Sequence, residues 1–463
     1  MRHIFSTIFF VAYAVLNAQE YSLEVIAHWD NESLRGIPPL SKSQQKYNDI
    51  WGWTNEQGRE FVILGSIDSI YFFDISNPYK PVLCDVEPGA DINCIHRDFK
   101  TYQNYCYAVA DEGNSTLQIF DLSYLPDSVQ MVYDTNYLTR RTHNVFIADN
   151  YAFLASNTHV KWPFIPMTIL DLNQPKNPKA IHHLKAPIVR DEPLFNHVHD
   201  VYFRDNIAYC SNGDDGLFIY DYSNISNPEL LYWLDNYPEQ GYNHSSWLNE
   251  EGNILVFADE THGLPLKCYD VSNPSRPKFL STFGFNHQLG SIVHNPFIVD
   301  NFCFVSYYHE GLQVFDISNP EQPKWVAGYD TYPENDVEGT YDGYKGCWGV
   351  YPFFESGVIA ASDMLNGLFL FKLNGWNKEI PVNTMFDVEI ASSRENLKLL
   401  FKKPFIGEVK TSFYSLNGQL INEQLAWKAG SELNINTSFL AKGIYLLKIE
   451  ANGYDNYKKV LIW

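Results

Sequence analysis

The sequence predicts an all-β protein: a seven-bladed β-propeller closed by its N-terminal strand, followed by a small C-terminal β-sandwich. Three observations predict it. An apolar run, an aspartate and a turn recur along the chain, the last repeat lacks its fourth strand, and a different all-β pattern begins after Leu373. The 463 residues, 16% of them aromatic and 19% charged, suit large cores built from strands.

The N-terminal segment 1–18 predicts a signal peptide. Arg2 precedes an apolar run from Ile4 to Leu16, and Ala18 is a small residue at the expected cleavage site. The run is too short to cross a bilayer, and no later segment is long enough to do so. We therefore expect export, with Gln19 as the first mature residue and no transmembrane span in the mature chain.

The repeat that follows is centred on an aspartate and has a nearly constant period. Consecutive aspartates are separated by 47, 50, 50, 49 and 46 residues. Each period holds four apolar runs separated by turn residues, which is typical of a four-stranded blade. Asp and Ser side chains bond nearby amides in the turn, and Pro ends the strand pairing. The aspartates are Asp74, Asp121, Asp171, Asp221, Asp270 and Asp316.

The last blade lacks a fourth strand. Strands are expected at 348–354, 357–362 and 367–373, and no turn with a further strand follows them. The segment from Glu24 to Asp30 precedes the first blade and resembles the fourth strands of other blades. We expect this segment to complete the last blade, because such pairing removes the open edge of the ring. The blade count is then seven.

The repeated motifs resemble those of a known family. They occur at Asp74, Asp270 and Asp316 (Asp-x-Ser-Asn-Pro), at His143, His199 and His294, and at Trp348 (Trp-Gly-Val-Tyr-Pro-Phe). The first motif resembles the LVIVD repeat, and the set resembles the choice-of-anchor B family of exported bacterial proteins over roughly residues 22–373. This resemblance implies a propeller joined to a variable anchoring module, and it implies no established reaction.

The C-terminal segment has its own pattern. Asn417-Gly418 and Asn452-Gly453 are hairpin signals between alternating strands. Segments 413–420, 440–447 and 458–462 resemble the type A sorting domain of type IX secretion. This resemblance implies a Gram-negative bacterium of the Bacteroidota and the type IX secretion machinery as partner. It also implies passage through the periplasm and across the outer membrane, with secretion or with attachment to the cell surface after removal of the domain. The usual Pro-Asn-Pro opening is missing, so a carbohydrate-binding or spacer sandwich is the alternative.

The domain boundaries follow from these patterns. We expect a signal peptide at 1–18, the propeller at 19–376, a linker at 377–385 and the sorting domain at 386–463. Because 33 basic residues stand against 55 acidic ones, the net charge is −22. This charge disfavours nucleic acid and anionic membranes but leaves cations and extracellular ligands such as glycans. The seven cysteines lack metal-site spacing. The sequence leaves open whether Cys94 and Cys106 form a disulfide.

Aligned on their first strands, the blades share a column rich in histidine. The innermost strand of a blade lines the central channel, so these side chains are expected at its mouth, with the two tryptophans adjacent. Neutral imidazoles are suitable ligands for a divalent transition metal such as Zn, Mn, Fe or Cu. The column holds Trp51, His96, His143, His199, His244, His294 and Trp348. The five histidines are the candidate metal ligands, and the two tryptophans are candidate ligand-binding residues.

A second polar column lies about fifteen residues further on, at the end of the second strand. Since that strand returns to the face where the first began, both columns should share one rim. Its acidic members are expected to help bind a ligand. They are Asp111, Glu112, Asp259, Glu260 and Glu310, beside Ser156, Asn157, Asn212, Asp214, His309, Ser362 and Asp363.

Two interpretations of the histidines stand side by side. A histidine that bonds within its own blade would be copied into every repeat, as in WD repeats, so all five could be structural; alternatively, they converge on a metal or a polar ligand. The acidic loop 330–346 could bind calcium or simply be solvated. Segments 157–168 and 185–197 could be specificity loops.

Two functions follow from the sequence. The first is a surface-displayed binding or scaffold propeller with a His-lined site. The alternative is a metal-dependent enzyme, such as a lyase, a hydrolase or an oxidase, that uses the histidine cluster. No hydrolase or nucleotide-binding motif is found.

Overall fold

The structure is a computed structural model that describes residues 21–36, 45–159, 164–286, 289–334, 341, 343–376, 388–392, 396–415, 418–451 and 454–462. The expected signal peptide, the linker and most acidic residues of the loop 330–346 lie outside the described residues. All the long regular elements of the described part are strands, and none of its helical turns is long and apolar enough to cross a membrane.

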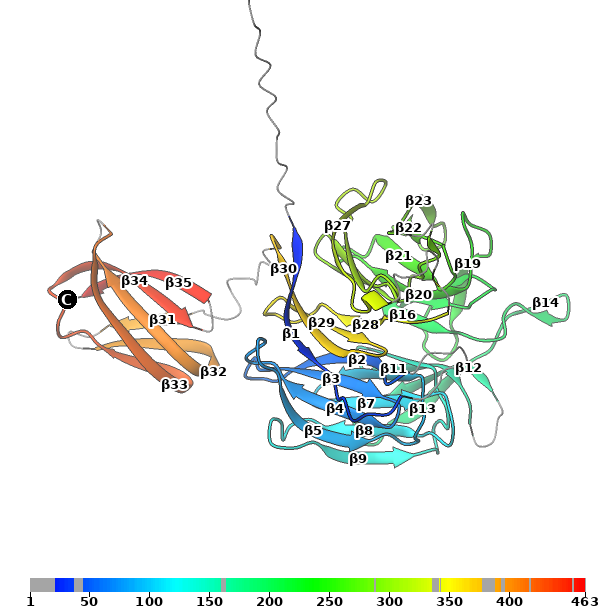
Figure 1. The fold of residues 1–463 in the computed structure, drawn as a ribbon, viewed down its shortest axis with the longest axis horizontal. Helices are drawn as coiled ribbons and strands as arrows, with labels where there is room; N and C mark the ends of the chain where they lie inside the picture. Colours follow the sequence, from blue (N-terminus) through cyan, green and yellow to red (C-terminus); the bar gives the residue numbers. More distant parts are fainter. Residues whose placement is uncertain are drawn as a thin grey trace, which may run out of the picture.

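Seven four-stranded antiparallel sheets form the blades (Figure 1). Blade one is β2 (Tyr47–Thr54), β3 (Glu60–Ser66), β4 (Ser69–Asp74) and β5 (Val82–Pro88). Blade two is β6 (Arg97–Tyr102), β7 (Tyr105–Ala110), β8 (Leu117–Asp121) and β9 (Gln130–Thr135). Blade three is β10 (Asn144–Ala148), β11 (Tyr151–Asn157), β12 (Ile165–Asp171) and β13 (Lys179–Leu184). Blade four is β16 (Asp200–Arg204), β17 (Ile207–Ser211), β18 (Leu217–Asp221) and β19 (Glu229–Leu234).

The remaining blades follow the same order. Blade five is β20 (Asn243–Leu248), β21 (Ile254–Asp259), β22 (Leu266–Asp270) and β23 (Lys278–Phe283). Blade six is β24 (Pro296–Val299), β25 (Phe302–Ser306), β26 (Leu312–Asp316) and β27 (Lys324–Tyr329). Blade seven is β28 (Cys347–Tyr351), β29 (Val358–Asp363), β30 (Gly367–Asn374) and β1 (Ser22–Trp29). A short hairpin, β14 (Ile188–Val189) and β15 (Glu192–Pro193), projects from the segment before blade four (Figure 1).

The N-terminal strand closes the ring, as the sequence predicts. Strand β1 pairs antiparallel with β30, and the pairing runs from Ser22 opposite Asn374 to Trp29 opposite Leu368. Contacts between neighbouring blades continue around the ring and return from β28 to β2. Every blade therefore has four strands, and blade seven takes one of them from the opposite end of the propeller sequence.

Aromatic side chains fill the channel at the far end of the inner strands. Trp247 packs against Phe297 and Phe353 at ring-centroid distances of 4.8 and 5.3 Å. Trp51 joins them at 6.2 Å from both Phe297 and Phe353. Since these large rings come from four different inner strands or the residues after them, they form an apolar plug, and the polar residues of the channel lie toward its other mouth.

The C-terminal strands form one bent sheet with its own core. It contains β31 (Val388–Ser392), β32 (Asn396–Tyr414), β33 (Leu420–Asn436), β34 (Gly443–Ala451) and β35 (Tyr454–Ile462). Strand β32 pairs with β31 near its start and with β34 near its end. Leu397 and Leu399 from the first half share one apolar cluster with Val409 and Phe413 from the second half. The two halves therefore enclose a common core.

The cysteines are all free thiols. Cys106 lies on β7 opposite Thr101 of β6, so the hairpin does not bring Cys94 to face it. Both thiols are buried. The disulfide that the sequence left open is therefore not formed, and these cysteines pack as small apolar side chains.

Candidate functional site

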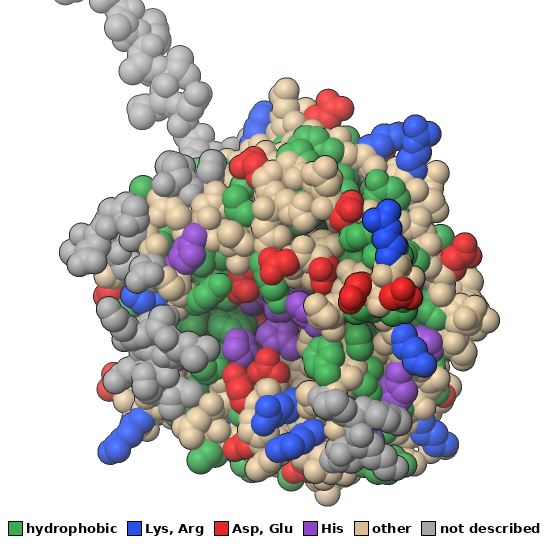
Figure 2. Space-filling model, turned by 90° about the vertical axis from the view of Figure 1, so that its right-hand side faces the viewer, with side chains coloured by type: hydrophobic (Ala, Val, Ile, Leu, Met, Phe, Trp, Pro, Cys, Tyr) green, Lys and Arg blue, Asp and Glu red, His purple; other side chains and the backbone are tan. Residues whose placement is uncertain are grey.

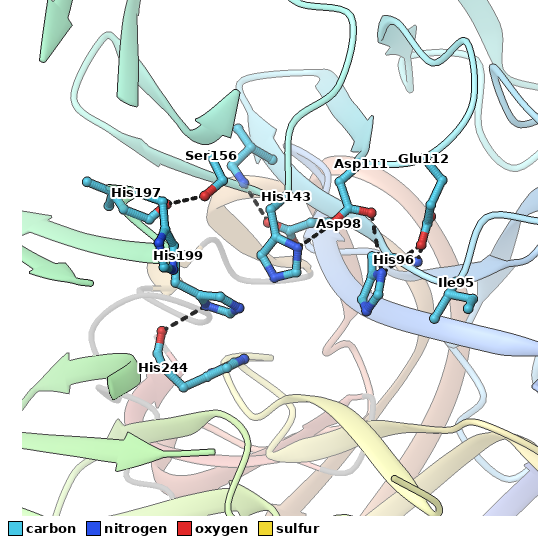
Figure 3. A network of polar contacts seen from close by, with 12 residues as sticks. Ile95, His96, Asp98, Asp111, Glu112, His143, Ser156, His197, His199 and His244 are labelled. Carbon is cyan, nitrogen blue, oxygen red and sulfur yellow. Dashed lines mark hydrogen bonds and ion pairs between the residues drawn. The ribbon is translucent and has the colours of Figure 1, made fainter. Parts of the chain in front are cut away.

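Five histidines and one tryptophan form a closed ring around the channel mouth. Successive ring centroids are 5.3, 4.2, 4.3, 4.4, 5.1 and 5.3 Å apart. The members, in order, are His96, His143, His199, His244, His294 and Trp348, which returns to His96. Each lies at or just before the start of an inner strand, in blades two to seven. Figure 3 shows the first four imidazoles turned toward one shared space.

The Nδ1 atoms of two buried rings anchor them to the next blade. Nδ1 of His199 donates to the carbonyl of His244 at 3.2 Å, and Nδ1 of His294 donates to the carbonyl of Trp348 at 2.6 Å. A carbonyl oxygen can only accept, so Nδ1 carries the proton in both rings. In the neutral ring, Nε2 then keeps its lone pair, and this tautomer is the one that ligates metals through Nε2.

Glu260 lies beside these Nε2 atoms. Its Oε2 is 3.8 Å from Nε2 of His244, and its Oε1 is 4.0 Å from Nε2 of His294. One ligand atom each from His199, His244 and Glu260 lie within 4.8 Å of one another. The hydroxyl of Tyr308 donates to Oε1 of Glu260 at 2.6 Å and holds the carboxylate in place. These residues could hold a metal ion.

The opposite side of the ring is a charge-paired network. Nδ1 of His143 bonds Oδ2 of Asp111 at 2.6 Å, and Nδ1 of His96 bonds Oε1 of Glu112 at 2.7 Å (Figure 3). His96, Asp111 and His143 also lie close enough together to hold a metal. In both rings, however, the Nδ1–H group donates a hydrogen bond to a carboxylate, so hydrogen bonds hold this cluster together.

The histidines on the two sides of the ring differ in their pKa values and therefore in their charge. Burial, together with the neighbouring histidines, holds the pKa of His199 and of His244 well below the ordinary value, and burial lowers the pKa of His294 to about 3. Burial also disfavours charge on His96. The hydrogen bonds that His96 makes to the carboxylates of Asp111 and Glu112 outweigh this effect of burial and raise the pKa of His96 to about 10. At neutral pH the imidazoles of His199, His244 and His294 are therefore neutral, whereas His96 is a cation.

A second polar layer lies one or two residues further along the inner strands. Asp49, Asp98 and Asp200 share with the histidine ring a cavity of about 30 Å³. Nζ of Lys100 bonds Oδ1 of Asp98 at 2.8 Å and lies 4.1 Å from the ring of Trp51. Burial raises the pKa of Asp200 to about 7. This layer was not predicted from the sequence, although charged residues inside an otherwise buried strand, as in Arg97-Asp98-Phe99-Lys100, are a signal for it.

Above the ring, the channel opens into a cavity of about 420 Å³. Tyr242 and Tyr344 border it, and both were missed by the sequence analysis. Figure 2 shows histidines gathered at the bottom of a hollow, with acidic side chains beside them. The remaining lining residues are His199, Glu260, Thr261 and His262. A ligand that enters from this side reaches the Nε2 face of the ring.

Three predicted ligand-binding residues lie elsewhere. Trp51 lies deeper in the channel, where its ring centroid is 5.0 Å from that of Tyr351, and it does not neighbour Trp348. Asp259 is fully buried and pairs with Lys267 at 2.8 Å. Glu310 accepts a hydrogen bond from the hydroxyl of Tyr341 at 2.7 Å in a separate groove.

Most of the other polar residues of the second column serve the backbone. The Ser156 hydroxyl bonds the carbonyl of Val198, and the Asn212 amide bonds the carbonyl of His197. Asp363 accepts from the hydroxyl of Thr331 at 2.6 Å. Asp111, Glu112 and Glu260 are thus the acidic members of the second column that contact the ring histidines.

Fold and site together define a β-propeller with a histidine-lined channel mouth. Residues 197–234 and 297–331 match the LVIVD repeat, and residues 381–463 match the secretion system C-terminal sorting domain. The resemblances to the LVIVD repeat and to a type IX sorting domain are confirmed, and the resemblance to the choice-of-anchor B family stays a prediction. The sorting domain implies interaction with the type IX secretion machinery and a secreted or cell-surface location.

Comparisons with whole proteins add no activity. A search of curated proteins finds no match. Similar solved structures include the Pseudomonas aeruginosa periplasmic gluconolactonase PpgL, with 13% identity over 84% of this chain and 99% of that chain and a TM-score of 0.48. The RRP9 WD40 repeats show 10% identity over 72% and 96%, with a TM-score of 0.47. At such identities and TM-scores, no function is carried over.

Proposed function

We propose that this protein is an exported binding propeller that holds a divalent transition metal at its channel mouth, with His199, His244, His294 and Glu260 as ligands. One observation carries the proposal. Three neutral imidazoles from successive blades and one carboxylate direct donor atoms toward the same space. Imidazole and carboxylate donors together suit Zn, Mn, Fe or Cu.

The spacing of the donor atoms supports a metal. Donors around a tetrahedral Zn²⁺ lie roughly 3.3 Å apart, given metal–ligand bonds of about 2.0 to 2.1 Å. Glu260 Oε2 to His244 Nε2 and Glu260 Oε1 to His294 Nε2 are 3.8 and 4.0 Å. Small rotations of the side chains would therefore bring the donors to coordination distance.

The alternative of purely structural histidines predicts a different pattern. Purely structural rings would point between the blades and share no centre, whereas metal ligands converge on one point. Here Nδ1 of His199 and of His294 bonds the following blade, and Nε2 faces the channel. The Tyr308 hydroxyl that orients Glu260 is the kind of outer partner that metal sites use.

Elemental analysis of protein purified without a histidine tag tests the proposal. We expect about one transition-metal ion per chain, lost in His199→Ala with His244→Ala and retained in the control His183→Ala, a histidine on β13 outside the ring. A metal-free wild-type protein that also fails to take up Zn²⁺, Mn²⁺ or Cu²⁺, and that the double substitution merely destabilises, would refute the site.

A second candidate function is a metal-dependent enzyme. It is favoured by the cavity of about 420 Å³ beside His199 and Glu260, which leaves room for a substrate next to the metal. Turnover of a polysaccharide or ester by the metal-loaded protein, lost in His199→Ala and kept in His183→Ala, would establish it. Metal binding without turnover across such a panel supports the binding propeller instead.

We also propose a route by which the protein is secreted or reaches the cell surface. Segment 1–18 would direct export to the periplasm, and the type IX machinery would carry the chain across the outer membrane. The division into 19–376, 377–385 and 386–463 would then separate the binding body, a linker and the sorting signal. Edman sequencing or mass spectrometry of the secreted protein tests this route: Gln19 as the mature N-terminus supports it, and an intact N-terminus contradicts it.

A further inference from the structure

A second cavity, of about 420 Å³, lies away from the channel, between the chain that follows blade five and the outer strands of blade six. The histidine ring contributes no residue to it. One side consists of Phe285, Asn286 and Leu289, which follow β23. The other side consists of Glu310, Gln313, Trp325, Gly328, Tyr329, Asp330 and Tyr341. We call this cavity the blade-six groove.

Aromatic side chains supply its apolar surface. Trp325 stacks on Phe285 with ring centroids 5.1 Å apart and an interplanar angle of 20°. Trp325 nevertheless remains 41% exposed. Tyr329, on the same strand, packs its ring on Phe369 and Phe371 of blade seven, so Trp325 supplies the exposed aromatic face of the groove. Large aromatic faces left uncovered at a cavity are suitable contact surfaces for a ligand.

The indole of Trp325 is held in a fixed position. Its Nε1 donates to Oε1 of Gln313 at 2.7 Å, and Gln313 is buried on the neighbouring strand β26. Gly328 makes this possible, because a Cβ at that position would lie 2.1 Å from Oε1 of Gln313. A rigid aromatic face loses little entropy when a ligand binds to it.

The polar groups of the groove favour a ligand that donates hydrogen bonds. Glu310, a carboxylate that is only 6% exposed, is oriented by the Tyr341 hydroxyl, and Asp330 lies at the rim. Ionised carboxylates only accept hydrogen bonds. No lining residue among those described carries a positive charge, so a phosphate, a sulfate or an acidic sugar would be repelled.

From these features we propose that the blade-six groove binds a neutral oligosaccharide. The C–H face of a sugar ring would pack on Trp325, and its hydroxyl groups would donate to Glu310 and Asp330. The inference is independent of the metal proposed for the channel. It gives the molecule a second binding site of different chemistry.

Calorimetric titration of the full chain with cellohexaose, xylohexaose, mannohexaose and N-acetylchitohexaose tests this proposal. We expect at least one of them to bind with a Kd below about 1 mM. Trp325→Ala should weaken that binding about ten-fold or more, and Glu310→Gln, which keeps the size of the side chain, should weaken it as well. Removing metal with a chelator should leave the binding unchanged.

Trp233→Ala is the matched control, because Trp233 lies on the fourth strand of blade four, outside the groove, and its Nε1 is likewise held by an acceptor, the carbonyl of Asp215. Thermal melts confirm that each variant is folded. Failure of all four sugars to bind would overturn the proposal. So would binding that is unchanged in both Trp325→Ala and Glu310→Gln, or preference for oligogalacturonate or for a lysine-rich peptide over the neutral sugars.

Discussion

A proton on one nitrogen decides what each ring histidine can do. In His199 and His294 the Nδ1–H group donates a hydrogen bond to the backbone of the next blade, so the unprotonated Nε2 keeps a lone pair toward the channel. In His96 and His143 the Nδ1–H groups donate hydrogen bonds to the carboxylates of Glu112 and Asp111, respectively. Identical side chains therefore have different roles around one ring, and the partner of Nδ1 sets the role.

Tyr308 offers a test of metal positioning. Tyr308→Phe removes the hydroxyl that orients Glu260 but leaves the aromatic ring. We expect metal affinity, measured by competition with a chelator, to fall roughly 10-fold to 100-fold, while the melting temperature of the metal-free protein changes little. Tyr307→Phe is the control, because its hydroxyl accepts from the amide of Phe285. Equal affinity in both variants would contradict a positioning role.

Asp363 predicts a pH dependence. Burial raises its pKa to about 6 in the folded protein, against about 3.9 in an unfolded chain. The folded state therefore holds this proton more tightly, and the stability linked to it is present below about pH 4 and is lost as the pH rises through 6. We therefore compare the melting temperature of Asp363→Asn with that of wild type at each pH. The variant's melting temperature minus that of wild type should be larger at pH 8 than at pH 4. A difference that does not vary with pH would contradict this.

Particular residues show how far the sequence could predict the site. The ring histidines could be found because each opens an inner strand at a regular interval. Trp51 was aligned with them wrongly: it lies after the irregularity in the β2–β3 pairing, whereas His244 and Trp348 lie within the corresponding irregularities of blades five and seven. Asp259 could have been excluded, since Lys267 inside an apolar strand needs a buried carboxylate. The hydrogen-bond partners of Nδ1 depend on the neighbouring blade and leave no local pattern in the sequence.

At the scale of strands, turn chemistry made the blades predictable. In the Asp-x-Ser turns the Asp side chain accepts from the Ser amide, as Asp74 does from Ser76 at 2.8 Å and Asp316 from Ser318 at 2.8 Å. This local bond ends the third strand of a blade in the same way each time. Strand β1 could be assigned to blade seven because only that blade lacked a partner for its last strand.

The pairing of β1 with β30 predicts that a covalent link there stabilises the molecule. Glu24 lies directly opposite Lys372, so Glu24→Cys with Lys372→Cys should form a disulfide. The oxidised variant should unfold at a temperature several degrees higher, because the bond closes a loop that spans the whole ring. Glu24→Cys alone is the control. If oxidation leaves the melting temperature unchanged, unfolding does not begin at this closure.

At the scale of the whole molecule, the separate apolar cores predict that the propeller folds independently of the C-terminal sheet. The apolar cluster of the C-terminal sheet contains no residue of the propeller. A chain that ends after Trp376, whose ring packs on Phe304 and whose Nε1 bonds Asp300, should keep the melting temperature of the propeller. It should also fail to reach the cell surface, as measured by protease accessibility on whole cells. A large loss of stability would contradict independent folding.

Strand β30 also determines how the propeller would respond to a pulling force. It is not an edge strand, because β1 lies on one side of it and β29 on the other. If the protein is tethered through the chain beyond Asn374, a load along the strand axis shears two hydrogen-bonded ladders at once. An edge strand would peel from a single neighbour. Borrowing the last strand from the other end of the chain therefore gives a tethered propeller mechanical resistance at the point where the load enters.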